Sequence, residues 1–180
     1  PIHGKGVRVI WLKGETDMLG ALEEVESFGE FAKRNNAVAS TVVKSFEHLI
    51  CTEQLSCRLG FRVGEELIRV VRVRSLNGNA RQVDHGYFLA SIAKGLTPEI
   101  AADSIYGYLE HKRGVKVMAS RRTVSVELAN DEDCSYLDLG KYNCVAVMES
   151  QSYTSDGILF EVTHARTHPE IFHYRVNSKR

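Results

Sequence analysis

The stretch LIRVVRVRSLNGNARQVDHGYF, which runs from Leu67 to Phe88, decides how this chain folds. Near its middle, Asn77-Gly78 supplies two residues that tolerate the positive φ angles of a tight turn. Extended segments flank this turn, and the first of them is dense in β-branched residues: Ile68, Val70, Val71 and Val73. The stretch therefore predicts a β-hairpin.

Two arginines stand in the first strand of this hairpin, where apolar side chains are expected. Alternation along a strand places Arg72 and Arg74 on one face, with Cα atoms about 6.5–7 Å apart. Two guanidinium groups side by side repel each other unless an anion lies between them, and they suit a phosphate or a carboxylate. The alternative is a solvated edge on which both arginines pair weakly with nearby acids.

The register of the hairpin decides whether Asp84 joins these arginines. A two-residue loop pairs Arg72 with Val83 and places Asp84 on the opposite face of the sheet. A three-residue loop that includes Asn79, with a bulge, pairs Arg72 with Asp84 and brings the carboxylate onto the arginine face. Both registers remain open at this stage, but a ligand site requires the second.

Length and composition indicate one main domain. The chain has 180 residues, 43% of them hydrophobic, which is enough for a core of its own. Its 23 basic and 23 acidic residues cancel, which argues against binding DNA or an anionic membrane through the general surface. No apolar run approaches the roughly 20 residues of a membrane span. The four cysteines include no CxxC pair and indicate a cytoplasmic protein with reduced thiols.

The rest of the sequence predicts further strands and short helices. Capping residues predict helices over residues 28–33 and after Thr52, Thr97 and Ser104, and an acidic helix start at residues 130–133. Extended runs predict strands at residues 38–46, 115–128, 143–153, 158–167 and 172–176. Six or seven strands, mainly connected by hairpins, imply an α+β domain on a largely antiparallel sheet.

Ser104 opens one of the predicted helices, in the sequence DSIYGYLE. Its simplest role is to cap that helix. A helix N-terminus also presents unpaired N–H groups and a partial positive charge, which favour a phosphate. Capping and anion binding are compatible, so Ser104 is a candidate for both.

Other kinds of site find less support. His164 and His168 have the spacing of a helical zinc pair, but in an extended segment this spacing separates them by roughly 13 Å, too far for one ion. The chain has no GxSxG motif, and no cysteine has the local signature of a nucleophile. Arg121 and Arg122 are interpreted as part of a solvated face. We therefore expect no catalytic residue, no metal and no cofactor.

From about Ser27 to Val176 the chain resembles the effector-binding domain, called UTRA, of GntR-type transcription regulators of the HutC subfamily. The resemblance is carried by the Arg-x-Arg strand with its N-G turn and following acid, by Ser-x-Tyr at Ser104, by the Asp-Leu-Gly at residues 138–140, and by the closing segment FEVTHARTHPEIFHY. Within the family, SIYGYLE, LTPEIAADSIY and THARTHPEIF are most similar to repressors of trehalose utilisation, which sense a phosphorylated disaccharide.

This resemblance implies a chorismate-lyase-like fold and a repressor domain that binds a sugar phosphate such as trehalose 6-phosphate. It also implies a homodimer that contacts operator DNA through an N-terminal winged-helix domain absent from this chain. The opening HGKGVRVI is similar to the end of a wing, so residues 1–10 are expected to be its remnant. Residues 11–26 are then a linker, and residues 27–180 are the effector-binding domain.

The resemblance also implies which residues bind the effector. Four positions match those that hold the phosphate: Arg72, Arg74, Ser104 and Tyr106. Asp84 and Glu161 match acids that bind sugar hydroxyls, and Ser40 matches a further phosphate contact. The chain departs from the family at Asp84, where many relatives carry glutamate. The alternative function is a chorismate-lyase-like enzyme, because the same arginines would also hold a small carboxylate.

Overall fold

The computed structural model describes residues 19–20 and 25–174. Its main element is a six-stranded antiparallel sheet with the strand order β2-β3-β4-β7-β6-β5. The strands are β2 (Ala39–Ile50), β3 (Glu66–Leu76), β4 (Asn79–Leu89), β5 (Val117–Leu128), β6 (Cys144–Thr154) and β7 (Leu159–Thr167). The predicted α+β fold on a largely antiparallel sheet is confirmed.

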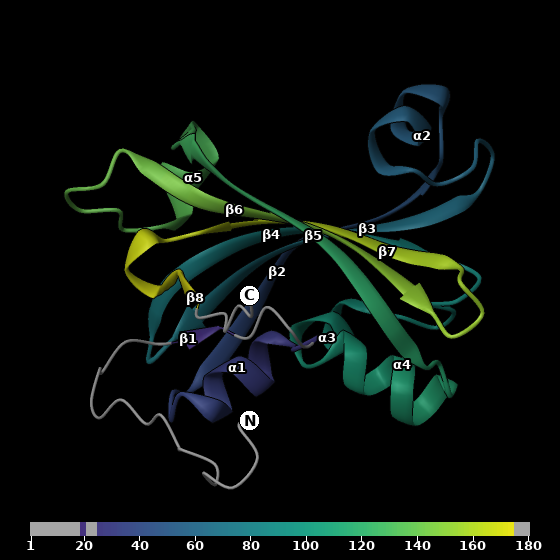
Figure 1. Ribbon diagram of the computed structural model, residues 1–180, viewed down its shortest axis with the longest axis horizontal. Helices are drawn as coiled ribbons and strands as arrows, with labels where there is room; N and C mark the ends of the chain where they lie inside the picture. The colour runs from purple at the N-terminus through teal and green to yellow at the C-terminus, as the bar shows by residue number, and fades with distance from the viewer. Residues whose placement is uncertain (1–18, 21–24, 175–180) are drawn as a thin grey trace, which may run out of the picture.

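Short helices lie on both sides of this sheet (Figure 1). Three of them lie on one side: α1 (Phe28–Arg34), α3 (Pro98–Ala102) and α4 (Ile105–Arg113). On the other side, α2 (Glu53–Leu59) and α5 (Asp131–Tyr136) lie at opposite ends of the strands. Each helix begins at a residue whose side chain accepts a backbone N–H bond: Ser27, Thr52, Thr97, Ser104 and Asn130. The predicted helix starts are therefore correct.

The central hairpin forms with a turn of two residues, not the three that the ligand-site register was expected to need. Asn77 and Gly78 have φ angles of 50° and 83° and connect β3 directly to β4. The extra residue that shifts the register lies instead in a bulge of β4, at Arg81. Beyond the bulge Arg72 pairs with Asp84, so both arginines and the carboxylate share one face of the sheet.

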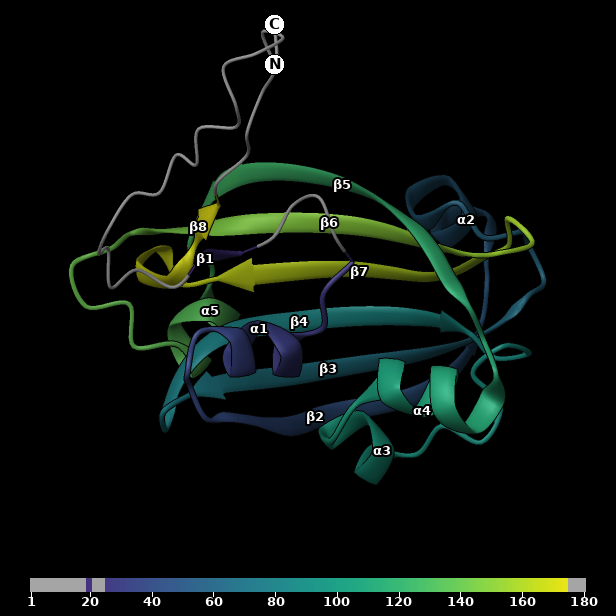
Figure 2. The same cartoon turned by 60° about the horizontal axis from the view of Figure 1, so that its bottom comes forward.

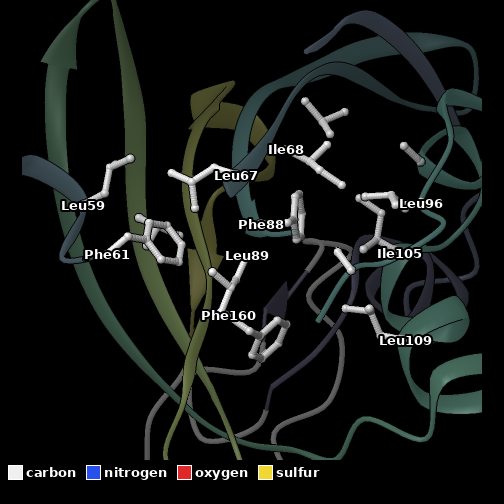
Figure 3. Close-up of a cluster of buried hydrophobic side chains, with 14 of the residues drawn as sticks. Leu59, Phe61, Leu67, Ile68, Phe88, Leu89, Leu96, Ile105, Leu109 and Phe160 are labelled. Carbon is white, nitrogen blue, oxygen red and sulfur yellow. The ribbon is translucent and has the colours of Figure 1, made fainter. Parts of the chain in front are cut away.

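Two apolar clusters hold the helices against the sheet. The larger one joins strand residues such as Ile68 and Phe88 to Ile105 and Leu109 of α4 (Figure 3). Gly86 is needed here, because a Cβ atom at this position would lie 2.7 Å from the Phe88 ring. A second cluster packs the segment after α5 against the other face of the sheet; its buried members are Val71, Val83, Leu137, Leu139, Val145 and Val147.

The two ends of the domain meet in a small separate sheet. β1 (Leu19–Gly20) pairs in parallel with β8 (His173–Tyr174), which follows a 3-10 turn at Pro169–Ile171. The strand predicted at residues 172–176 is confirmed at His173–Tyr174, but it lies outside the main sheet. The predicted wing remnant at residues 1–10 lies outside the described residues, as does most of the predicted linker at residues 11–26. In residues 19–20 and 25–174, no helix has the length and apolar character to cross a membrane.

Candidate functional site

A cavity of about 340 Å³ lies on the sheet face that α1, α3 and α4 cover. In Figure 2 these helices lie in front of the strands that form its floor. All seven residues predicted to bind an effector line this one cavity: Ser40, Arg72, Arg74, Asp84, Ser104, Tyr106 and Glu161. Its volume lies at the lower end of the range for small-molecule sites, which is about 300–1,000 Å³.

Strand alternation and the bulge together bring these side chains to one face. Arg72 on β3 lies opposite Asp84 on β4, which in turn lies opposite Ala165 on β7. The next row on this face contains Gly86, Thr163 and Ser150; the Phe88 ring lies over Gly86, while Thr163 and Ser150 line the cavity. Glu161 faces the same side because it is an even number of residues from Ala165 along β7.

Arg72, Arg74 and Asp84 form a buried charged cluster in this floor. Arg72 donates to Asp84 Oδ2 through Nε at 3.0 Å and also through Nη2, while Arg74 Nη2 donates to the same oxygen at 2.9 Å. Arg72 and Asp84 are 4% and 3% exposed. Burial acts to raise the pKa of Asp84, but the charges of Arg74 and Arg72 outweigh burial and hold it below its usual range. The Asp84 carboxylate is thus shared by the guanidinium groups of Arg72 and Arg74.

Arg74 keeps capacity for another acceptor. Its Nε atom is buried and has no hydrogen-bond partner among the described residues. Burial, together with the charge of Arg72, lowers the pKa of Arg74 to about 10, so its guanidinium is still charged near neutral pH. Phe28 of α1 covers it, with the guanidinium carbon 5.2 Å from the ring centroid. An anionic group in the cavity would satisfy the Nε donor and offset the excess positive charge.

Tyr106 and Glu161 form a second polar cluster in the same cavity. The Tyr106 hydroxyl donates to Glu161 Oε2 and lies 3.1 Å from Ser152 Oγ. Burial raises the pKa of Glu161, which is only 4% exposed, and burial and the nearby Glu161 charge raise the pKa of Tyr106. Tyr106 therefore stays a hydrogen-bond donor. A carboxyl and a phenol side by side are suited to recognising hydroxyl groups.

Ser104 has both of the properties expected of it. Its hydroxyl accepts a 3.0 Å bond from the Gly107 N–H and so caps α4, and its side chain also lines the cavity. The first turn of α4 is therefore directed at the cavity, and its N–H groups add a partial positive charge there.

Several cavity residues were not predicted from the sequence. Arg122 was interpreted as part of a solvated face, but it is half-buried and lines the cavity from β5, so that interpretation is wrong for Arg122. Arg121 is exposed and faces the opposite side. The remaining polar and aromatic lining residues include Thr41, Gln82, Ser120, Ser150, Thr163, Thr167, Phe28, Phe172 and Tyr174. The two-residue spacing of Ser120 and Arg122 on a predicted strand, which places both side chains on one face, was the sequence signal that could have identified this wall of the cavity.

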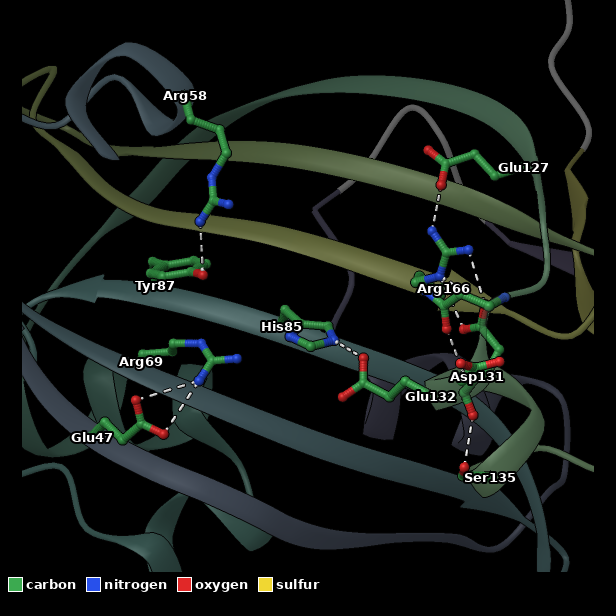
Figure 4. A network of polar contacts seen from close by, with 12 residues as sticks. Glu47, Arg58, Arg69, His85, Tyr87, Glu127, Asp131, Glu132, Ser135 and Arg166 are labelled. Carbon is green, nitrogen blue, oxygen red and sulfur yellow. Dashed lines mark hydrogen bonds and ion pairs between the residues drawn. The ribbon is translucent and has the colours of Figure 1, made fainter. Parts of the chain in front are cut away.

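A second hollow, of about 590 Å³, lies on the opposite face of the sheet between α2 and α5. Its charged groups are largely paired with one another or with near neighbours (Figure 4). Arg69 bonds Glu47, His85 lies 2.8 Å from Glu132, and Arg166 bonds Asp133. These basic side chains already have carboxylate partners, whereas the smaller cavity contains the Arg74 Nε donor that has no partner among the described residues, so this hollow is the weaker candidate for an anionic ligand.

Comparison with known proteins gives consistent results. The family model for the UTRA domain matches residues 34–173. The chain is 27% identical over 173 residues to the HTH-type transcriptional regulator TreR of Bacillus subtilis (strain 168), covering 96% of this chain and 71% of that protein. It is 22% identical over 166 residues to the HTH-type transcriptional repressor NagR of the same organism, and spans 66% of its length.

Solved structures agree with this match. The effector binding domain of the B. subtilis trehalose repressor (TreR) superimposes with a TM-score of 0.69 at 27% identity, covering 78% of this chain and 98% of that one. PhnF from Mycobacterium smegmatis superimposes with a TM-score of 0.78 at 18% identity, covering 91% of this chain and 73% of that one. The second likeness shows the fold alone.

Proposed function

Because the chain belongs to the family of UTRA domains of GntR-type regulators, we propose that it senses a phosphorylated sugar and thereby controls a DNA-binding repressor. Its similarity to TreR extends over nearly the whole chain, which supports a TreR-like effector domain. The relatives are transcription regulators, so the proposed role is ligand binding without catalysis. Fold alone would not justify this step, since one fold hosts many functions.

One observation carries the choice of ligand class. Arg72 and Arg74 converge on a single carboxylate oxygen inside a cavity, and a buried donor of Arg74 has no acceptor among the described residues. Leaving such a donor unpaired is costly, about 1–3 kcal/mol, so an added anion gains both hydrogen bonding and charge pairing. A phosphate has the oxygens to bridge two guanidinium groups.

The polar side chains away from the arginines support a sugar as the rest of the ligand. Glu161 presents a carboxyl group, and the walls add serine and threonine hydroxyls. Trehalose 6-phosphate is the specific ligand we propose, because TreR is described as a trehalose repressor and this chain resembles its effector domain. In this assignment Arg72, Arg74, Ser104, Tyr106 and Ser40 hold the phosphate, while Asp84 and Glu161 bind hydroxyls.

The wider function is proposed in the same way. Operator DNA would be bound through an N-terminal winged-helix domain, and the regulator would be a HutC-type, cytoplasmic homodimer. A two-fold protein suits operators whose two half-sites are related by symmetry. The net charge of the chain is zero, so its overall charge gives no general attraction to DNA.

Isothermal titration calorimetry with trehalose 6-phosphate, trehalose and chorismate tests the ligand class. Each charge-assisted hydrogen bond contributes roughly 1.5–3 kcal/mol, so loss of the phosphate should weaken binding by about a hundredfold or more. Equal affinity for the phosphorylated and free sugar would place the site elsewhere. Tighter binding of chorismate than of either sugar would favour the lyase-like alternative.

A further inference from the structure

The wall of the cavity that lies across the sheet from Arg72 is formed by β6 and β5. Arg122 of β5 pairs with Ser150 of β6, which pairs with Thr163 of β7, and all three residues line the cavity. Three strands, β4, β7 and β6, separate β5 from β3, which carries Arg72 (Figure 2). Four strand spacings of about 4.8 Å place Arg122 about 19 Å from Arg72 along the sheet. The cavity therefore has arginines on two opposite walls.

Aromatic side chains complete this second wall, which we call the Arg122 wall and define as Ser120, Arg122, Ser150, Phe172 and Tyr174. The rings of Phe172 and Tyr174 pack edge to face, with centroids 4.8 Å apart and planes at 66°. Burial raises the pKa of Tyr174, and the charge of Arg122 acts against this shift, so the guanidinium lies within electrostatic range of the phenol. The wall thus combines apolar ring surface with a guanidinium and two serine hydroxyls.

The chemistry of the Arg122 wall differs from that of the arginine pair. Arg72 and Arg74 lie together and share one carboxylate, whereas the described lining residues of β5 and β6 contain one cation, Arg122. A single guanidinium among neutral hydroxyl and phenol groups is suited to the hydroxyls of an uncharged sugar ring rather than to a second phosphate. Aromatic surface beside a few polar groups is typical of a small-molecule site.

The strands between the two walls leave room for one sugar ring before the Arg122 wall is reached. Asp84 and Glu161, the acids proposed to bind hydroxyls, lie on β4 and β7. The strand of Glu161 is two strand spacings, about 10 Å, from the strand of Arg122. The ring of a monosaccharide phosphate held by Arg72 and Arg74 would lie beside these acids, and only a second ring would extend to β5.

We propose that the Arg122 wall binds the second ring of the effector and makes the cavity select a disaccharide phosphate over a monosaccharide phosphate. This proposal rests on the proposed function, because it requires a sugar whose phosphate is held by Arg72 and Arg74. Arg122 donates hydrogen bonds to hydroxyl oxygens of the second ring, and Phe172 and Tyr174 contact its carbon atoms. Arg122 is then the residue that distinguishes the two lengths of ligand.

Isothermal titration calorimetry with trehalose 6-phosphate and glucose 6-phosphate tests this role. The wild-type protein should bind the disaccharide phosphate at least about tenfold more tightly. Arg122→Met keeps an unbranched side chain but removes the donors, so it should weaken trehalose 6-phosphate binding about tenfold or more and change glucose 6-phosphate binding less than about threefold. Arg121→Met is the matched control, because Arg121 is the preceding residue of β5 and faces the opposite side of the sheet. This control should bind both ligands like wild type.

Ser150→Leu is an independent variant that decides the question if Arg122→Met fails to fold. Its larger side chain would fill the space of the second ring and should likewise weaken only trehalose 6-phosphate binding. An equal loss of affinity for both ligands, or an unchanged affinity for trehalose 6-phosphate, would overturn the proposal in either variant. Equal binding of the two phosphates by the wild-type protein would also overturn it while leaving the phosphorylated-sugar function intact. Wild-type protein that binds neither phosphate would refute both.

Discussion

Asp84 accepts hydrogen bonds from Arg72 and Arg74 through one oxygen, so the pair of cations is already partly neutralised before any ligand binds. A phosphate that enters the cavity must share these guanidinium groups with Asp84. This lowers the affinity for weak anions and favours a dianion, because only a strong acceptor gains enough from the remaining donors. The geometry of the arginine pair therefore explains a preference for a dianion over weaker anions better than the number of charges in the cavity does.

Replacing Arg72 with lysine tests this arrangement. Lysine keeps the charge but loses the planar fork that reaches Asp84 through two nitrogens. Because the pair is buried, Arg72→Lys should lower the free energy of unfolding by about 1–3 kcal/mol and weaken phosphate-ligand binding about tenfold or more. Urea unfolding and calorimetry measure the two effects.

Arg69→Lys is the matched control, because Arg69 lies on the same strand and pairs with the exposed Glu47 on the opposite face. A surface pair of this kind contributes about 0–1 kcal/mol, so both stability and ligand affinity should change little. Wild-type ligand affinity in Arg72→Lys would show that Arg72 does not hold the ligand, whatever its effect on stability.

Among the structural elements, α4 is the one whose start serves both the fold and the cavity. Removing the Ser104 hydroxyl in Ser104→Ala deprives Gly107 N–H of its acceptor, which should cost about 1 kcal/mol of stability. Thr52→Ala removes an equivalent cap from α2, on the opposite side of the sheet and away from the cavity. The two variants should therefore lose similar stability, and only Ser104→Ala should also bind the phosphorylated sugar less tightly. Similar ligand affinity in both would leave Ser104 with a capping role alone.

Much of the element order could be predicted from local signals, but three features could not. Caps such as Thr52 and turns such as Asn77-Gly78 act within a few residues, so the sequence shows them directly. The bulge at Arg81 has no comparable local signature, because it depends on which face of β4 must be buried.

The other two features depend on distant parts of the chain. Arg122 is a cavity residue only because distant segments, which include those of Phe28 and Tyr174, complete the cavity on its face of the sheet. The closing strand was predicted from its alternating pattern, but it pairs with residues 19–20 outside the main sheet. The seven candidate site residues line one cavity, and the family resemblance is what identified them. The contribution of Arg122 to the cavity was missed, because it depends on tertiary packing alone.

For the molecule as a whole, Glu161 should give the stability a pH dependence. Burial raises its pKa in the folded protein, so between 4.5 and that raised value the folded state binds more protons than the unfolded chain. The contribution of Glu161 is therefore present at acid pH and is lost as pH rises. Asp84 has a lowered pKa, so its contribution is lost only as pH falls below 3.8.

Glu161→Gln removes the proton equilibrium while it retains an oxygen that can accept the Tyr106 hydroxyl. Relative to wild type without ligand, the variant should become progressively more stable as pH rises above 4.5, until Glu161 of the wild-type protein is ionised. Urea unfolding at several pH values measures this difference, with Glu66→Gln as a control in which the lost carboxyl is exposed. A constant difference between Glu161→Gln and wild type across this range would contradict the prediction.

The parallel pairing of β1 with β8 links ligand binding in the cavity to the two terminal segments of the domain. Tyr174 both lines the cavity and pairs with Gly20, so separating the two terminal segments also disturbs one wall of the cavity. If the pairing of these segments increases the affinity for a ligand that contacts Tyr174, the bound ligand must stabilise the pairing by the same free energy. The sheet can then remain rigid. A ligand in the cavity would therefore make it harder to separate residues 19–20 from β8.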